Sequence, residues 1–433
     1  MIIGWYNLVD YVNLDYEPSE NDLIAMYYVE ISPECKNLEQ ASEEIAKESS
    51  IGTWTEIATL SAEIAERLKP STFYIDKVNS IVKIAYTKEL FEASNLPQIL
   101  SAIAGNIYGM KVLKSLRLLD ISFPKDIVKA YRGPKFGIEG IKKLTNVKDR
   151  PLLGTIVKPK VGLNEVEHAK VCGDAWQGGL DIVKDDENLT SMTFNKFEKR
   201  ITETLKIRDK IESKTGERKF YMPNITASLS VMKKRADFVV ENGGEYVMVD
   251  IVTIGFSALQ EIREYLDNKD VAIHAHRAMH AAFTRNKKHG MTMLALAKLM
   301  RLIGMDQLHT GTIVGKMEGE KKEVLEINDI ISNPHIKDNN LTTLNQDWYT
   351  IKPVLPVASG GLSPLHVPEL IKILGKDMVY QFGGGCHGHP DGTKAGARAI
   401  RQAVDAILQG YSLNEYAKNH SELAKAIEKW GMK

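Results

Sequence analysis

One lysine and three carboxylates follow a short apolar segment in the stretch 178–188. Residues 180–183 predict a buried strand that leads into Lys184, Asp185, Asp186 and Glu187. Carboxylates at the end of a strand can hold a hard, oxygen-seeking ion such as Mg²⁺. An ammonium group cannot ligate a metal, so Lys184 would contribute only if it were neutral or converted by CO2 to a carbamate. The alternative is an ordinary solvated turn.

Two further pairs of residues carry groups that move protons. Lys158 and Lys160 flank a proline, and two lysines in one pocket lower each other's pKa and can then exchange protons. The alternative is a pair of surface lysines. His274 and His276 are two positions apart in a predicted strand, so both would face the same side. The alternative is a pair of hydrogen-bonded core histidines.

Paired glycines indicate anion binding. Gly360, Gly361, Gly383 and Gly384 carry no Cβ atom, so their backbone N–H groups can converge on phosphate oxygens. The alternative is that these glycines only form tight turns. A second anion site could be formed by Arg277 and His309, which would imply a substrate with two phosphate groups. The stretch 315–320 contains Lys316 between glycines and suggests a mobile lid, with a plain surface loop as the alternative.

Composition limits the classes of function. The chain has 433 residues, of which 43% are hydrophobic, and 56 Lys+Arg balance 56 Asp+Glu. This balance gives no field that favours nucleic acid or an anionic membrane surface. We find neither a membrane-length apolar run nor a signal peptide, and three separated cysteines form no disulfide framework. A reduced cytoplasmic enzyme is the expectation.

The elements that must position these groups fall into two parts, residues 1–132 and 133–433. The first part mixes strands at 23–31, 73–86 (a hairpin) and 112–123 with helices at 38–47 and 97–107. This pattern predicts a small α+β domain with an antiparallel sheet. The second part predicts eight strand–helix units, with strands at 153–157, 180–183, 220–224, 246–252, 271–276, 307–313, 354–358 and 378–382.

Eight such units in about 300 residues are typical of a (β/α)8 TIM barrel. A doubly wound open sheet is the alternative, and the lack of a GxGxxG motif after the first strand weakens it. In a barrel the active site lies at the carboxyl ends of the strands. Nearly every predicted strand ends there in groups that do chemistry or bind anions, so the strand ends predict one site.

Seven blocks in this order resemble the large subunit of ribulose-1,5-bisphosphate carboxylase/oxygenase (RuBisCO), over about residues 23–406. The blocks are 52–55 (GTWT), 155–160 (TIVKPK), 178–188 (GGLDIVKDDEN), 274–280 (HAHRAMH), 309–319 (HTGTIVGKMEG), 355–361 (LPVASGG) and 381–385 (QFGGG). The resemblance implies an N-terminal ferredoxin-like α+β domain and a C-terminal barrel. It also implies carboxylation of ribulose 1,5-bisphosphate by CO2, with competing oxygenation by O2, to give 3-phosphoglycerate.

The resemblance further assigns roles to residues. It implies that Lys184 becomes a carbamate and binds Mg²⁺ with Asp186 and Glu187. It implies catalytic roles for Lys158, Lys160, His276, Lys316 and Glu48. It implies one phosphate site at Thr53, Trp54, Lys316, Gly360, Gly361, Gly383 and Gly384, and another at Arg277, His309 and Ser359. Glu48 and Asn106 match residues lent by a neighbouring subunit, so a homodimer, or a higher assembly of dimers, is expected.

The short C-terminal part and the sequence 386–389 (CHGH) resemble the archaeal form III enzymes, which lack small subunits and act in nucleotide salvage. The alternative is a RuBisCO-like enolase or isomerase that acts on another phosphorylated sugar-like substrate. Such proteins typically lose several of the loop and proton-transfer residues, and here these residues are present.

Overall fold

The structure is a computed structural model that describes residues 10–53, 55, 57–314 and 321–431. The chain forms two compact units. The first comprises the chain up to Arg132 together with Met279–Leu302 and Asn333–Ile351, and the second comprises Gly133–Ala278, Ile303–Ser332 and Lys352–Lys433. In the described part of the chain, no helix is long and apolar enough to cross a membrane.

A five-stranded sheet with the order β10-β4-β1-β3-β2 organises the first unit. Its strands are β1 (Asp22–Ile31), β2 (Ser71–Asp76), β3 (Ile81–Thr87), β4 (Leu113–Ser122) and β10 (Gly290–Met291). Strands β1 to β4 pair antiparallel, as the sequence predicted, whereas β10 joins β4 in parallel. The helices of this unit are α1 (Leu38–Glu48), α2 (Ala62–Leu68), α3 (Leu96–Ile103), α4 (Lys125–Ala130), α11 (Ala281–Thr284) and most of α12 (Met293–Ile303).

The helix predicted over 97–107 is shorter than expected. Helix α3 ends at Ile103, and a separate 3₁₀ turn, η3 (Asn106–Gly109), follows it. Gly105 separates them in a backbone conformation that brings a would-be Cβ atom to 2.1 Å from the Ser101 carbonyl oxygen. A side chain at position 105 therefore cannot be accommodated without a shift of the chain, and the break depends on glycine.

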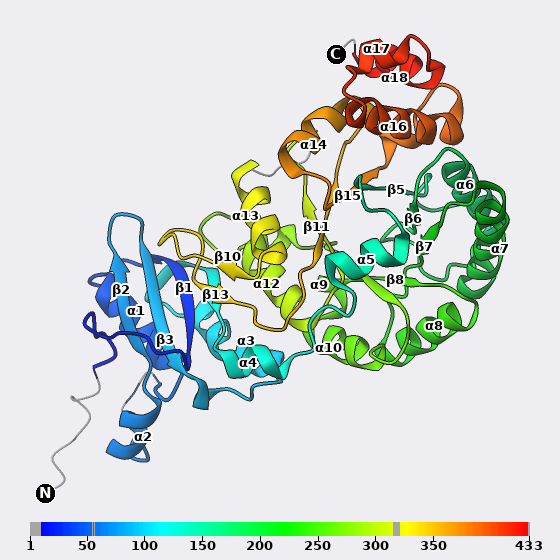
Figure 1. Cartoon of the computed structure of the whole chain (residues 1–433). Helices are drawn as coiled ribbons and strands as arrows, with labels where there is room; N and C mark the ends of the chain where they lie inside the picture. The colour runs from blue at the N-terminus through cyan, green and yellow to red at the C-terminus, as the bar shows by residue number, and fades with distance from the viewer. Residues whose placement is uncertain (1–9, 54, 56, 315–320, 432–433) are drawn as a thin grey trace, which may run out of the picture. The chain divides into compact units, whose positions relative to one another are not determined.

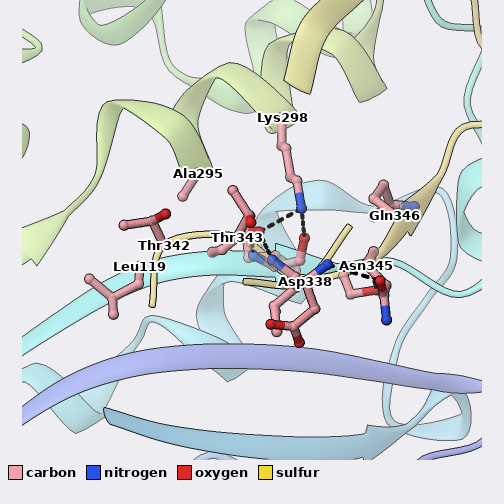
Figure 2. Close-up of polar contacts among 12 residues, drawn as sticks. Leu119, Ala295, Lys298, Asp338, Thr342, Thr343, Asn345 and Gln346 are labelled. Carbon is pink, nitrogen blue, oxygen red and sulfur yellow. Dashed lines mark hydrogen bonds and ion pairs between the residues drawn. The ribbon is translucent and has the colours of Figure 1, made fainter. Parts of the chain in front are cut away.

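A buried ion pair ties helix α12 to strand β4 inside the first unit. Lys298 and Asp120 are both fully buried, and the Lys298 Nζ donates to Asp120 Oδ2 at 2.7 Å and to the Ile121 carbonyl at 2.8 Å. The backbone N–H of Leu344 donates to the same carboxylate oxygen. Figure 2 shows Lys298 reaching from its helix toward the segment that carries Thr343 and Asn345. Three distant parts of the sequence thus meet at one carboxylate.

We expect Asp120→Leu to destabilise the protein by about 3–5 kcal/mol, because it leaves the Lys298 ammonium buried without a counter-charge. The double variant Asp120→Leu/Lys298→Met should recover most of this loss, because well-packed apolar residues replace a buried pair at little cost. Thermal unfolding of the single and double variants measures both effects. A double variant as unstable as the single one would contradict this account of the pair.

The second unit contains eight parallel strands in the order β7-β6-β5-β15-β14-β11-β9-β8. They are β5 (Leu152–Ile156), β6 (Ile182–Lys184), β7 (Phe220–Met222), β8 (Tyr246–Asp250), β9 (Ala272–His276), β11 (Gln307–Gly311), β14 (Leu355–Ser359) and β15 (Val379–Phe382). A parallel bridge between Asn224 and Met248 joins the two ends of this order. The predicted eight-stranded barrel is therefore confirmed, and every predicted strand overlaps an observed one.

Helices follow the strands of this unit, and α6, α7, α8 and α10 lie outside the strands (Figure 1). The helices are α5 (Gly137–Thr145), α6 (Glu165–Gln177), α7 (Phe197–Thr215), α8 (Leu229–Glu241), α9 (Ile251–Ile254), α10 (Phe256–Tyr265), α13 (Lys321–Ser332), α14 (Val367–Leu374), α15 (Gly384–His387), α16 (Gly392–Leu408), α17 (Leu413–Ala417) and α18 (Ser421–Gly431). Helix α5 packs Ile138 and Ile141 against inward-facing residues near the strand starts, including Leu152 and Val379. This core closes the amino end of the barrel.

Candidate active site

The side-chain alternation of the strands places polar groups at the other end of the barrel. Ile182, Tyr246 and Ala272 belong to the apolar core inside the barrel. Because side chains two positions apart share a face, the same inner face continues to Lys184, Asp250 and His276. A single period-2 pattern in each strand therefore produces an apolar floor and a polar opening.

Lys184 is almost completely buried, with 1% of its side chain exposed. Its Nζ atom donates to the Asp185 carbonyl at 2.9 Å and lies 3.7 Å from Glu187 Oε2. Burial lowers the pKa of Lys184, although neighbouring carboxylates oppose that shift. A lower pKa increases the fraction of neutral amine, which is the form that can attack CO2.

Asp186 and Glu187 follow Lys184 and lie beside it. Asp186 Oδ2 accepts a hydrogen bond from Lys158 Nζ at 2.7 Å, and its Oδ1 accepts one from Asn188 Nδ2 at 2.9 Å. Burial raises the pKa of Asp186, but these hydrogen bonds outweigh it and hold the pKa below its usual value. The Asp186 carboxylate is therefore charged and oriented, and Lys158 is held next to it.

Asp185 points the other way, into a buried polar network. Its carboxylate accepts hydrogen bonds from Arg200 Nη2 at 3.0 Å, from the Asn224 backbone N–H at 2.9 Å and from the Tyr221 hydroxyl. Arg200 and Asp185 are fully buried. Burial raises the Asp185 pKa, but the Arg200 charge and the hydrogen bonds from His168 and Tyr221 together outweigh it and hold the pKa below its usual value. Asp185, which lies between the inward-facing Lys184 and Asp186, thus anchors the turn from outside the barrel.

His276 lies between two carboxylates. Its Nδ1 atom is 3.2 Å from Asp250 Oδ1 and its Nε2 atom is 3.6 Å from Glu187 Oε2. Sequence reasoning missed Asp250, which ends strand β8 and is buried. The same alternation that marked His276 could have found it, because Tyr246, Met248 and Asp250 share one face.

The predicted phosphate glycines follow strands β14 and β15. Gly360 and Gly361 both have positive φ angles, of 116° and 70°. Gly383 lies beside Lys158, because a Cβ atom at Gly383 would come within 3.8 Å of the Lys158 side chain. Apart from its neighbours in the chain, no atom of the described residues lies within 4 Å of a Cβ atom placed at Gly384, so this backbone borders open space at the barrel opening.

Arg277 follows strand β9, His309 lies in the middle of β11, and Ser359 ends β14. His309 Nδ1 lies 2.8 Å from Ser359 Oγ. The Arg277 guanidinium lies against Gly311, where a Cβ atom would come within 2.9 Å of Nη2. Burial lowers the pKa of Arg277 to about 10, so this side chain stays a cation at neutral pH.

Other predicted residues lie elsewhere. Lys160 is exposed, so the two lysines that flank Pro159 do not share a pocket in the isolated chain. Glu48 and Asn106 meet in the first unit, where Asn106 Nδ2 donates to Glu48 Oε1 at 3.4 Å. Thr53 is half-buried in that unit. Trp54 and Lys316 lie outside the described residues.

The chain matches two family models, which together cover most of its length. Residues 10–127 match the ribulose bisphosphate carboxylase large chain, N-terminal domain. Residues 137–430 match the ribulose bisphosphate carboxylase large chain, catalytic domain.

Similar proteins come from archaea. The chain is 54% identical to a ribulose bisphosphate carboxylase of Methanocaldococcus jannaschii, over 98% of this chain and 100% of that protein. Among solved structures, the octameric enzyme of Pyrococcus horikoshii superposes with a TM-score of 0.91 at 49% identity, over 99% of this chain and 98% of that one. The dimeric enzyme of Hyperthermus butylicus superposes with a TM-score of 0.92 at 44% identity, over 98% of this chain and 99% of that one.

Proposed function

The chain belongs to the ribulose bisphosphate carboxylase large-chain family, and we propose that it carboxylates ribulose 1,5-bisphosphate at the barrel opening, around Lys184, Asp186 and Glu187. The observation that carries this proposal is the buried Lys184 amine beside the carboxylates of Asp186 and Glu187. The relatives named above are carboxylases, so the comparisons do not support the alternative of an enolase or isomerase. Competing oxygenation by O2 belongs to the same proposal.

The donor set at this position fits Mg²⁺. In the described part of the chain, no three His, Cys, Asp or Glu side chains cluster as a ready metal site. A carbamate on Lys184 would supply the missing oxygen ligand, next to Asp186 and Glu187. All three ligands would then be anionic oxygens, which Mg²⁺ prefers. A bound Mg²⁺ supplies Lewis acidity that stabilises negative charge developing on substrate oxygens.

The carbamate forms when the neutral Lys184 amine attacks the carbon of CO2 and the nitrogen then loses a proton. The structure supports this step in two ways. Burial lowers the pKa of Lys184, and the contact with the Asp185 carbonyl holds the amine in place at 2.9 Å.

Proton transfer is proposed for Lys158, whose ammonium is oriented by Asp186 and borders Gly383. It would protonate the carbanion left by cleavage of the carboxylated intermediate. His276, positioned by Asp250, would assist in transfers at substrate oxygens. Lys160, Lys316 and Glu48 keep their catalytic roles as predictions from the family resemblance.

The two phosphates are assigned to two sets of residues at the barrel opening. Gly360, Gly361, Gly383 and Gly384, with Thr53, Trp54 and Lys316, would bind one phosphate through backbone N–H groups and one cation. Arg277, in the region of His309 and Ser359, would supply the charge for the other. Glu48 and Asn106 would serve the site of a neighbouring subunit, so we propose a homodimer as the minimal active unit. The cytoplasmic location, the form III subclass and its role in nucleotide salvage stay predictions from the sequence.

The direct test is incorporation of labelled bicarbonate into acid-stable product with ribulose 1,5-bisphosphate and Mg²⁺. Labelled 3-phosphoglycerate is the expected result. No label, with the substrate C3 proton still exchanging with solvent, would overturn the carboxylase assignment in favour of an enolase.

Gly384→Ala tests the phosphate loop. Beyond its chain neighbours, the added methyl group meets no atom of the described part of the protein within 4 Å, so we expect unchanged thermal stability. The methyl group nevertheless enters the space where the phosphate would bind. We expect KM for ribulose 1,5-bisphosphate to rise about ten- to a hundredfold, because hydrogen bonds to a charged group are each worth about 1.5–3 kcal/mol. Steady-state kinetics and thermal melting measure both quantities.

The neighbouring glycine provides a contrast. A Cβ atom at Gly385 would come within 2.1 Å of the Leu362 carbonyl oxygen, so Gly385→Ala should lower stability itself. An unchanged KM in Gly384→Ala would exclude this loop as the phosphate site.

A further inference from the structure

A chain of buried hydrogen bonds runs through the barrel interior and ends at Ser359. Gln307 Nε2 donates to the Tyr246 hydroxyl at 3.2 Å, and Gln307 Oε1 lies 2.9 Å from His274 Nδ1. His274 Nε2 lies 2.9 Å from His309 Nε2, and His309 Nδ1 lies 2.8 Å from Ser359 Oγ. Tyr246, Gln307 and His274 are fully buried. Tyr246 and Gln307 have no role in the site predicted from the sequence, and none of the functions proposed above uses this series of hydrogen bonds as a whole.

The donor and the acceptor of each hydrogen bond in this series follow from the chemistry of the side chains. The amide nitrogen of Gln307 faces Tyr246, so the amide oxygen faces His274 and can only accept. His274 Nδ1 must therefore carry a hydrogen, and a neutral imidazole then has a bare Nε2 atom. That bare nitrogen can only accept, so His309 Nε2 must donate.

The same reasoning continues to the end of the chain. With its hydrogen on Nε2, a neutral His309 has a bare Nδ1 atom, which must accept the hydroxyl hydrogen of Ser359. Both nitrogens of His309 are then engaged within the protein. The Ser359 oxygen faces the opening with lone pairs and has no hydrogen left to donate.

Both histidines are neutral in this environment. They are buried, and in the described part of the chain neither ring forms a hydrogen bond or ion pair with a carboxylate. Burial is the main cause that lowers the pKa of His274 to about 3. Burial and the nearby cationic groups also place the pKa of His309 well below its usual value.

We propose that Tyr246, Gln307 and His274 are positioning residues that set the direction of the Ser359 hydroxyl, so that Ser359 accepts a hydrogen bond from a hydroxyl group of the substrate and does not donate to a phosphate. The inference rests on the proposed function for the identity of the substrate, a polyhydroxylated sugar bisphosphate. It refines the second phosphate site, because the charge there falls on Arg277 while Ser359 reads a neighbouring hydroxyl.

Histidine tautomers provide the first test, and this test does not require enzymatic activity. The ¹⁵N spectrum of protein labelled at histidine distinguishes a protonated ring nitrogen from a bare one. We expect His274 to carry its hydrogen on Nδ1 and His309 on Nε2, with assignments made from His274→Gln and His309→Gln. A hydrogen on Nδ1 of His309 would mean that His309 donates to Ser359, which reverses the hydrogen-bond direction and overturns the proposal.

Three variants test the role of Gln307. Gln307→Glu places a carboxylate beside His274 Nδ1, which favours a His274 ring with a hydrogen on both nitrogens. His309 should then carry its hydrogen on Nδ1, and KM should rise. Gln307→Leu removes the acceptor, and Tyr246→Phe frees the amide to turn. Each should give a mixture of His309 tautomers and raise KM about three- to tenfold with little change in kcat. Gln402→Leu is the control. Gln402 is a buried glutamine on α16 that donates a hydrogen bond to Glu422 on α18, so its loss should affect stability only.

Inorganic phosphate distinguishes the two possible partners of Ser359. We expect Ser359→Ala to raise KM for ribulose 1,5-bisphosphate about tenfold, while the inhibition constant of inorganic phosphate stays unchanged. A parallel rise in both constants would show that Ser359 donates to phosphate and would overturn the proposal. If the protein proved inactive, the tautomers would still be measurable, so failure of the proposed function and failure of this inference are separable.

Discussion

Lys184→Met is expected to reduce carboxylation of ribulose 1,5-bisphosphate by about 10³-fold or more. The substitution removes the only nitrogen that can form the carbamate, while the methionine side chain fits a buried position between Met248 and Asp185. Loss of a bound metal removes several kcal/mol of stabilisation of the reacting charge, and each 1.36 kcal/mol is tenfold in rate. The rate is measured with labelled bicarbonate.

Two further readouts follow the site itself. Mg²⁺ with bicarbonate should raise the melting temperature of the unmodified protein, because a ligand that binds only the folded state stabilises it. This rise, and the ¹³C resonance of a carbamate after incubation with labelled bicarbonate, should both disappear in Lys184→Met.

The control for this variant is Lys219→Met. Lys219 is also fully buried, but it precedes strand β7 and donates to the Leu180 carbonyl near the amino end of the barrel. Its replacement should lower stability yet preserve the response to Mg²⁺ and bicarbonate. Carboxylation retained in Lys184→Met would exclude the carbamate assignment.

Lys158→Met is expected to lower kcat by about 10²–10⁴-fold, the range for loss of a general acid or base. Unlike Lys184→Met, it should keep the carbamate resonance and the thermal response, because Asp186 and Glu187 remain. Loss of the ion pair with Lys158 should also raise the pKa of Asp186 toward its usual value, since that hydrogen bond contributes to lowering it.

The matched control is Lys199→Met, on the exposed side of helix α7. It removes the same charge from the same unit and should leave kcat unchanged. If Lys158→Met retained full turnover, the proton-transfer role would have to be assigned to another residue.

The sequence predicted the barrel because each strand is an apolar run that ends in polar residues, and this pattern is local. It could not predict that Met279–Leu302 and Asn333–Ile351 pack with the first unit. The ion pair that connects them joins Lys298 and Asp120, which are 178 positions apart. No periodicity signals such a distant pair.

In the candidate site too, residues that are close in sequence could be predicted, whereas contacts between distant residues could not. Lys184, Asp186 and Glu187 were found because they are neighbours in the chain. Asp250 was missed although the alternation within β8 places it on the inner face, and its pairing with His276 depends on the register of β8 against β9. The hydrogen bonds from Tyr246 to Ser359 cross four strands, so no single stretch of sequence contains the pattern.

The outward-facing Asp185 limits how this site can be moved to another protein. The turn at 184–187 can form the site only if Lys184 and Asp186 face the inside of the barrel and Asp185 faces the outside. Deleting one residue before Lys184 would exchange ligand and anchor, placing Asp185 in the opening and Asp186 against Arg200. A designer who transplants the site into a new barrel must therefore also carry Arg200, Tyr221 and the backbone at Asn224. The segment that must be transferred is therefore the carboxyl ends of β6 and β7 together with helix α7 between them, and not a tetrapeptide.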